Sequence, residues 1–380
     1  MKPPIYLDYN GTTPNDPEVI AAMRPFMETK FGNPSSSHWY GIAPRRAVET
    51  ARAQVASILN CDPEEIMFTG GGTESNNHAI KGVARLLKDK GNHIITSEIE
   101  HPAVLEVCKV LESEGFDITR LPVDESGIVR ISDVAKAIRT DTILITIMYA
   151  NNETGAVQSI EEIGKLAREN NIIMHTDAAQ SVGKIPTDVK ALNVDLLSVA
   201  GHKVYAPKGI GALYIRRPLK LEPFCHGAGQ EDGRRAGTEN VIEIVGLGKA
   251  CEIAKQDLDQ NMAHMKRLRD RLHDGLAAKI EDIRLNGHTD LRLPNTLNLS
   301  FYDLEANRIL EEIGLEVAAS AGAACHSGTV EISHVLTAMG IDEDWAKGTV
   351  RFSVGRMTTE AEIDRTIEVV SKTVLNLRAV

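Results

Sequence analysis

The stretch from Asn171 to Lys203 constrains the fold of this chain more than any other. Two short apolar runs, 172–174 and 196–199, are bounded by polar and turn residues, a pattern typical of buried strands in a parallel sheet. The first run leads to Asp177 and the second to Lys203. Because open α/β sheets bind ligands beyond the carboxyl ends of their strands, we expect both side chains to face one cavity. An acid that keeps a ring nitrogen protonated and a lysine that forms a Schiff base are the minimum for a pyridoxal phosphate (PLP) site. Taken singly, either residue also fits a helix cap or a solvated lysine.

Strand and helix patterns alternate along the first two thirds of the chain. Apolar runs between turn residues predict strands at 66–69, 93–97, 117–123, 142–149 and 211–215. Helices are expected at 16–30, 44–59, from 73, from 102 and at 159–170. These repeated βα units predict an α/β fold with a mostly parallel sheet, covered by helices on both faces and closed by the strand 211–215.

The pattern changes after about Val241. Residues up to about Ile280 contain no proline and are rich in helix-forming side chains, which predicts one or two long helices. Short strands at 296–301 and 349–354 then mix with helices at 304–313, 331–339 and 360–378. This mixture predicts a second, α+β domain.

Composition narrows the classes of function. The net charge of −11 argues against nucleic acid as a partner, and 4% aromatic residues leave few stacking platforms for single strands. No stretch approaches the ~18 uncharged apolar residues that a membrane span needs, and the N-terminus lacks a signal-peptide core. We therefore expect a cytoplasmic protein with no membrane partner.

Five scattered cysteines, at 61, 108, 225, 251 and 325, form no CxxC pair, so no resident metal is expected. Four of them fit inert buried side chains. Cys325 differs because it lies in the small-residue segment SAGAACHSG, typical of an exposed loop. We expect a reactive thiolate there, with a pKa that His326 lowers if it is protonated. Cys325 is also the one candidate for transient ligation of a metal cluster.

Two glycine clusters have different meanings. Gly70–Gly72 and Thr73 follow a strand and open a helix, an arrangement that suits a single phosphate because the segment lacks the GK[ST] ending of a P-loop. A glycine-rich turn capped by threonine explains this cluster equally well. The second cluster, 227–237, lacks the spacing and the preceding strand of a dinucleotide site, so NAD and FAD are rejected. Its residues Arg234 and Arg235, with Thr238, are expected to meet an anion or a neighbouring subunit.

Polar residues follow two further strands. His101 comes after the strand 93–97 and directly before Pro102, while Asn152 lies in the turn after 142–149. Both are therefore expected beside Asp177 and Lys203. Arg351 lies within a predicted strand, where an arginine commonly has a fixed carboxylate partner. A surface cross-strand salt bridge is the plainer interpretation.

With these residues in place, the chain resembles the PLP-dependent cysteine desulfurases of the NifS/IscS family. The resemblance runs from end to end, through YLDYNGTTP, TGGGTESNN, EHPAV, ANNETG, HTDAAQ, GHKVYAPKG, RAGTEN and VRFSVGRMTTEAEID. It implies a fold-type-I homodimer. The PLP-binding large domain would span 15–256, and the small domain would comprise 257–380 together with the arm 1–14.

The resemblance also implies roles for the residues around the cofactor. Lys203, in preference to Lys184 or Lys208, would be the lysine bonded to PLP. Asp177 would pair with the pyridine nitrogen, and Gln180 with the ring hydroxyl. His101 would stack on the ring and move protons. The phosphate ligands would be Thr73, His202 and, from the other subunit, Thr238.

For the substrate, the resemblance implies that Asn152 and Arg351 hold the carboxylate of L-cysteine. Cys325 would accept the sulfur as a persulfide for delivery to an acceptor protein, such as an iron–sulfur scaffold. Two departures stand out. Ala200 replaces the serine that normally precedes GHK, so we expect weaker PLP retention. The sequence AACHSG is more similar to the corresponding segment of selenocysteine lyases, so selenocysteine stays open as the substrate. A sulfur-relay subunit without turnover is a further alternative, against which the intact Lys203, Asp177 and His101 argue.

Overall fold

In the computed structural model, which describes residues 3–321 and 332–379, the main sheet has seven strands in the order β2-β8-β7-β6-β5-β3-β4. Strands β3 to β7 run parallel to their neighbours in this set, whereas β8 is antiparallel to both β2 and β7. Their bounds are β2 Ile66–Thr69, β3 His93–Ser97, β4 Asp117–Leu121, β5 Thr142–Thr146, β6 Ile173–Asp177, β7 Leu196–Ala200 and β8 Gly211–Ile215.

The expectation that 211–215 closes the sheet is wrong, because β2 pairs along its outer side and forms the edge. Between β7 and β8 lie only ten residues, including the 3-10 turn η2 (Gly201–Lys203). That connection is too short for the helical crossover that a parallel neighbour needs, so the chain returns antiparallel.

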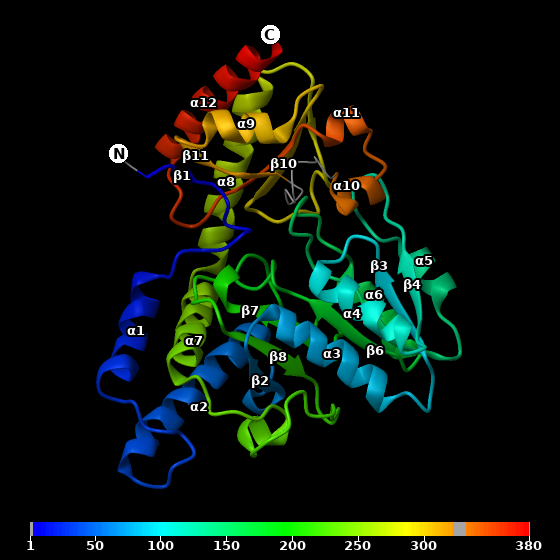
Figure 1. Cartoon of the computed structure of the whole chain (residues 1–380), viewed down its shortest axis with the longest axis vertical. Helices are drawn as coiled ribbons and strands as arrows, with labels where there is room; N and C mark the ends of the chain where they lie inside the picture. The colour runs from blue at the N-terminus through cyan, green and yellow to red at the C-terminus, as the bar shows by residue number, and fades with distance from the viewer. Residues whose placement is uncertain (1–2, 322–331, 380) are drawn as a thin grey trace.

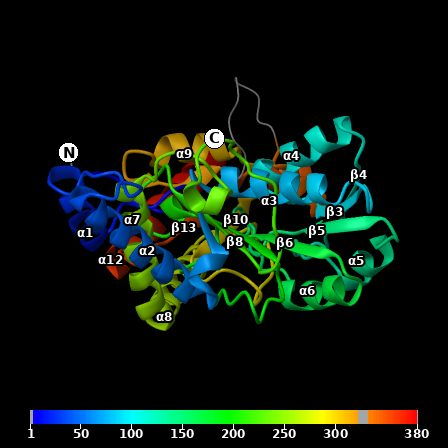
Figure 2. The same cartoon turned by 90° about the horizontal axis from the view of Figure 1, so that it is seen from below.

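Helices cover both faces of this sheet (Figures 1 and 2). Successive strand residues point to opposite faces: Leu144 packs in the cluster with α3 (Gly72–Leu86) and α4 (Pro102–Ser113), while Ile145 packs in the cluster with α6 (Ile160–Glu169). The other helices of this part are α1 Pro17–Glu28, α2 Trp39–Leu59, α5 Ile131–Ala137 and α7 Val241–Gln256, with the 3-10 turns η1 Pro63–Glu65 and η3 Gln230–Gly233.

Helix α2 begins five residues before the predicted start at Pro44. Pro44 is the sixth residue of this helix, where a proline removes a single intrahelical hydrogen bond out of the many that the 21-residue helix can form. The helix therefore continues through Pro44 from Trp39.

A second, antiparallel sheet has the order β12-β13-β10-β9. The arm joins this part of the molecule, since β1 pairs with β11 in parallel (Figure 1). Strand bounds are β1 Ile5–Tyr6, β9 Ile283–Leu285, β10 Thr296–Phe301, β11 Val317–Ala318, β12 Ser320–Ala321 and β13 Thr349–Ser353. Helix bounds are α8 Leu258–Ala277, α9 Ala306–Ile313, α10 His334–Ala338, α11 Glu343–Ala346 and α12 Glu360–Arg378. The domain boundary between residues 256 and 257 stays a prediction.

Across the described ranges, no helix combines the length and the apolar character needed to cross a membrane.

Candidate active site

A cavity of about 410 Å³ lies where the carboxyl ends of β3, β5, β6 and β7 meet the N-terminal arm and β13. Its volume falls within the usual range for small-molecule sites, about 300–1,000 Å³. Eight of the predicted site residues line it: Thr73, His101, Asn152, Asp177, Gln180, His202, Lys203 and Arg351. Thr238 is exposed and is not among the described residues that line this cavity. Cys325 and His326 lie outside the described residues.

Asp177 is the last residue of β6 and its carboxylate is held from two sides. Its Oδ2 accepts a hydrogen bond from Asn76 Nδ2 at 2.6 Å, and its Oδ1 accepts one from the main-chain N–H of Ala179 at 2.9 Å. Sequence reasoning missed Asn76, although a signal existed. It lies three residues after Thr73 on α3, and such residues share one helix face.

Lys203 ends the 3-10 turn that follows β7, and its amine points to the N-terminal arm. Nζ donates to the main-chain oxygens of Gly11, at 2.7 Å, and of Asn10. Burial and the nearby Arg351 lower the pKa of Lys203 to about 8, although Asp8 and Asp177 act in the opposite direction. A lowered pKa increases the fraction of neutral amine, the form that attacks a carbonyl. The arm residues Asn10 and Gly11 line the cavity and were also missed.

Two histidines flank Lys203 in the cavity. His101 caps α4, and its Nδ1 accepts the N–H of Ala103 at 3.1 Å, which leaves Nε2 as the protonated nitrogen of the neutral ring. Desolvation lowers the pKa of His101, with a smaller contribution in the same direction from Lys203. Burial and neighbouring lysines lower the pKa of His202 to about 4, so its ring is neutral near pH 7.

The start of α3 packs closely against β8. Gly71 has φ of 147°, a conformation suited to glycine, and a Cβ on Gly211 would lie 2.7 Å from the Gly71 main chain. The free N–H groups of a helix N-terminus favour an anion such as phosphate. Thr73 and Ala200 line the cavity at this end.

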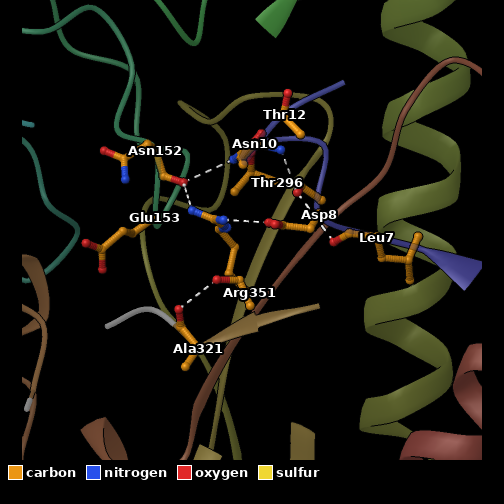
Figure 3. Close-up of polar contacts among 12 residues, drawn as sticks. Leu7, Asp8, Asn10, Thr12, Asn152, Glu153, Thr296, Ala321 and Arg351 are labelled. Carbon is orange, nitrogen blue, oxygen red and sulfur yellow. Dashed lines mark hydrogen bonds and ion pairs between the residues drawn. The ribbon is translucent and has the colours of Figure 1, made fainter. Parts of the chain in front are cut away.

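Arg351 on β13 has the fixed carboxylate partner that its place in a strand suggests (Figure 3). Nη2 lies 2.6 Å from Asp8 Oδ1 on the arm, and Nη1 donates to the main-chain oxygen of Asn152 at 2.9 Å. Its buried Nε has no hydrogen-bond partner among the described residues. Asp8 was missed because it lies 343 residues from Arg351.

The glycine-rich loop 227–237 engages its own chain. Arg235 Nε lies 2.9 Å from Glu74 Oε1, and Arg234 donates to the main-chain oxygens of Glu64 and Ile66. Glu231 accepts two hydrogen bonds from Arg52, at 2.8 and 2.9 Å. Within the chain, Arg235 thus meets the carboxylate of Glu74. The expectation that Arg234, Arg235 and Thr238 meet an anion or a neighbouring subunit stays a prediction.

The cysteines outside the Cys325 segment were expected to be inert and buried. Cys108 and Cys251 are buried as expected, and Cys61 is partly buried. Burial raises the pKa of all three thiols to about 12. Cys225 contradicts it, because its side chain is exposed. It lies before η3, in the segment 224–229, all of whose residues are exposed.

Comparisons with known proteins agree with this geometry. The family model of aminotransferase class-V matches residues 5–366. The cysteine desulfurase IscS of Dictyoglomus turgidum is 49% identical over 100% of this chain and 97% of its own length. The IscS of Methanosarcina thermophila is 50% identical, over 98% and 93%. A solved NifS-like protein superposes with a TM-score of 0.92 at 37% identity, covering 98% of this chain and 100% of that chain. A NifS-like protein from Rickettsia africae gives 0.88 at 31% identity, over 97% and 99%.

The mostly parallel sheet with helices on both faces and the cavity at its strand ends define the fold type I of PLP-dependent enzymes. The predicted fold class is thereby confirmed. Within this class, the chain belongs to the aminotransferase class-V family and, inside that family, to the NifS/IscS group, as its sequence motifs predicted.

Proposed function

We propose that the protein is a PLP-dependent cysteine desulfurase that converts L-cysteine to L-alanine and passes the sulfur to Cys325. One observation carries the proposal: a single cavity brings together the amine of Lys203, the carboxylate of Asp177, the imidazole of His101 and the guanidinium of Arg351. Each comes from a different segment of the chain. The curated relatives that match the full chain are named for this activity, and they do not favour selenocysteine lyase.

The donors of the cavity fit PLP. Asp177 offers a fixed carboxylate for the ring nitrogen, and the amide of Gln180 would bind the ring hydroxyl. The start of α3, with Thr73 and His202, would take the phosphate. The neutral amine of Lys203 would bond to the aldehyde. When bound, PLP supplies an electron sink for negative charge at the substrate Cα.

Lys203 and His101 are suited to proton transfer. With a pKa of about 8, Lys203 has an appreciable neutral fraction near neutral pH and would remove the Cα proton as a general base. His101 holds its proton at Nε2, because Nδ1 is engaged by the start of α4. Asn152 and Arg351 would hold the substrate carboxylate through charge-assisted hydrogen bonds.

The overall reaction balances when the cysteine thiol of the chain is a co-reactant. L-cysteine and the thiol of Cys325 give L-alanine and a persulfide: the Cβ–S bond of the substrate breaks and an S–S bond to Cys325 Sγ forms. Cβ is reduced while the two sulfurs are oxidised. The role of Cys325 rests on the sequence resemblance.

A homodimer and a sulfur-acceptor protein, such as an iron–sulfur scaffold, complete the proposal. Thr238 is exposed and is not among the described residues that line the cavity of its own chain; it would reach the phosphate of a partner subunit. Mixing subunits carrying Lys203→Ala with subunits carrying Thr238→Ala should restore one fully competent site per mixed dimer. Activity per Thr238→Ala subunit no higher than in the Thr238→Ala homodimer would contradict the shared site.

Product analysis tests the proposed activity. The protein loaded with PLP should form alanine and sulfide in equal amounts from L-cysteine in the presence of a thiol, and borohydride followed by peptide mapping should label Lys203. Lys203→Ala should abolish turnover, and Cys325→Ser should reduce it strongly. Unchanged turnover of Cys325→Ser would refute the nucleophile, and a label on another lysine would refute the site.

A further inference from the structure

The carboxylate of Asp8 forms an ion pair with Arg351, the residue that is proposed to bind the substrate carboxylate. Asp8 Oδ1 lies 2.6 Å from Arg351 Nη2, and the main-chain oxygen of Asn152 takes Nη1 at 2.9 Å (Figure 3). Arginine binds a carboxylate best through two parallel N–H···O bonds. Each terminal nitrogen already makes one of these contacts, so an incoming carboxylate is left with the remaining N–H groups and shares the charge of the guanidinium with Asp8.

Asp8 is close to the cavity wall. A Cβ on Gly11 would lie 2.3 Å from Asp8 Oδ2, and Gly11 lines the cavity. The side chains of Asp8 and Arg351 are 29% and 9% exposed, so solvent screens their interaction only in part. The charge of Asp8 therefore acts on any anion that approaches Arg351.

We propose that Asp8 is a specificity-determining residue that weakens the hold of Arg351 on amino-acid carboxylates. The charge of Asp8 offsets that of Arg351, so that substrate binds less tightly and alanine leaves more readily. The inference rests on the proposed function, which makes Arg351 the ligand of the substrate carboxylate. The Asp8–Arg351 ion pair then has two opposite effects: it stabilises the protein without substrate, and it weakens the binding of the substrate carboxylate.

The substitution Asp8→Asn removes the charge and keeps the shape. We expect the KM for L-cysteine and the inhibition constant of L-alanine to fall about fivefold, which corresponds to ~1 kcal/mol. The inhibition constant of cysteamine, which lacks the carboxylate, should stay the same. The Tm of the cofactor-free protein should fall, because Arg351 loses its charged partner. If Asp8 only supported the fold, the Tm would fall and the KM would be unchanged or higher, and that result overturns the inference.

Asp16→Asn is the matched control. Asp16 forms a second ion pair between the N-terminal segment and the region after β13, with Arg356, and neither residue is among the described residues that line the cavity. This variant should lower the Tm and leave the KM unchanged. Asp8→Glu, which keeps the charge, should retain the wild-type KM; a drop equal to that of Asp8→Asn would contradict the role of charge.

A readout without turnover separates this inference from the proposed function. In the cofactor-free protein, millimolar L-alanine should raise the Tm of Asp8→Asn more than that of the wild type, whereas cysteamine should not discriminate between them. Equal shifts would refute the role of Asp8. Absence of desulfurase activity in the wild type would instead refute the proposed function.

Discussion

Replacing Ala200 by serine should tighten the binding of PLP. Ala200 ends β7, is 5% exposed and lines the cavity. Its side chain faces the start of α3, since a Cβ on Gly72 would lie 3.2 Å from Ala200 Cβ. A hydroxyl group at this position would stand beside Thr73, where the phosphate is proposed to bind. The resemblance to the desulfurase family places a serine at the same point.

The expected magnitude follows from two opposing contributions. A hydrogen bond to a charged group contributes about 1.5–3 kcal/mol, and burying an unpaired hydroxyl in the cofactor-free protein costs about 1–3 kcal/mol. The free N–H groups at the start of α3, beside Ala200, can donate hydrogen bonds to that hydroxyl and so reduce the cost of burying it. We therefore expect the free energy of PLP binding to improve by ~1 kcal/mol, equivalent to about a fivefold lower Kd. The gain requires the phosphate, so the cofactor-free variant should have the same Tm as the wild type or a slightly lower one.

Titration of the cofactor-free protein with PLP, followed by absorbance, measures this Kd directly. Ala179→Ser is the matched control, because Ala179 lines the same cavity but follows β6, beside Asp177, whereas Ala200 ends β7. Its Kd should not improve. An unchanged or higher Kd for Ala200→Ser would show that the side chain at position 200 does not reach the phosphate, and the phosphate site proposed at the start of α3 would have to be reconsidered.

Three further outcomes are expected. Lys184→Met removes the buried amine that donates to Gln180 Oε1 at 2.6 Å. Because this contact orients the Gln180 amide, the absorbance band of bound PLP should shift and the Kd of PLP should rise about tenfold. An unchanged spectrum would contradict this role of Lys184. Glu231→Gln removes the buried charge partner of Arg52 and leaves it only the 3.4 Å contact with the exposed Glu49. Urea unfolding should therefore show a loss of about 3 kcal/mol, whereas an unmoved midpoint would refute a stabilising pair. The rate at which the cofactor-free protein captures PLP should rise with pH to a half-point near the Lys203 pKa of about 8, because only the neutral amine attacks. A stopped-flow half-point near the ordinary lysine value of 10.5 would contradict the lowered pKa.

Local sequence patterns predicted the strand ends that carry the site. The strands β2 and β3 have the predicted bounds, because each is a short apolar run closed by polar or turn residues. His101, Asp177 and Lys203 follow such runs, so their convergence could be inferred before any contact was known. The order of the outer strands could not be inferred, since it depends on how the 201–210 connection returns and not on the strand sequences.

The missing part of the prediction concerns contacts between distant segments. Asp8 meets Arg351 across 343 residues. Lys184 is buried and donates to Gln180 and Asn10, and desolvation holds its pKa well below the ordinary value. Neither contact leaves a periodic signal, because a single polar side chain fits a loop or a helix equally well. Short elements such as α11 were missed for a related reason: four residues depend on tertiary packing more than on helix propensity.

These distant contacts meet at Asn10, which shows why the site cannot be assigned to the main sheet alone. Its main-chain oxygen accepts hydrogen bonds from the Lys203 amine and from Gln180 Nε2. Its side-chain Nδ2 donates to the main-chain oxygen of Asn152 at 3.1 Å and to Thr296 Oγ1 on β10 at 2.8 Å. An amide is required here, because a carboxylate has no donor for these two oxygens. When the arm docks, Asn10 therefore positions Lys203, Gln180 and Asn152 together. The arm itself is held by the second sheet, through Thr296 of β10.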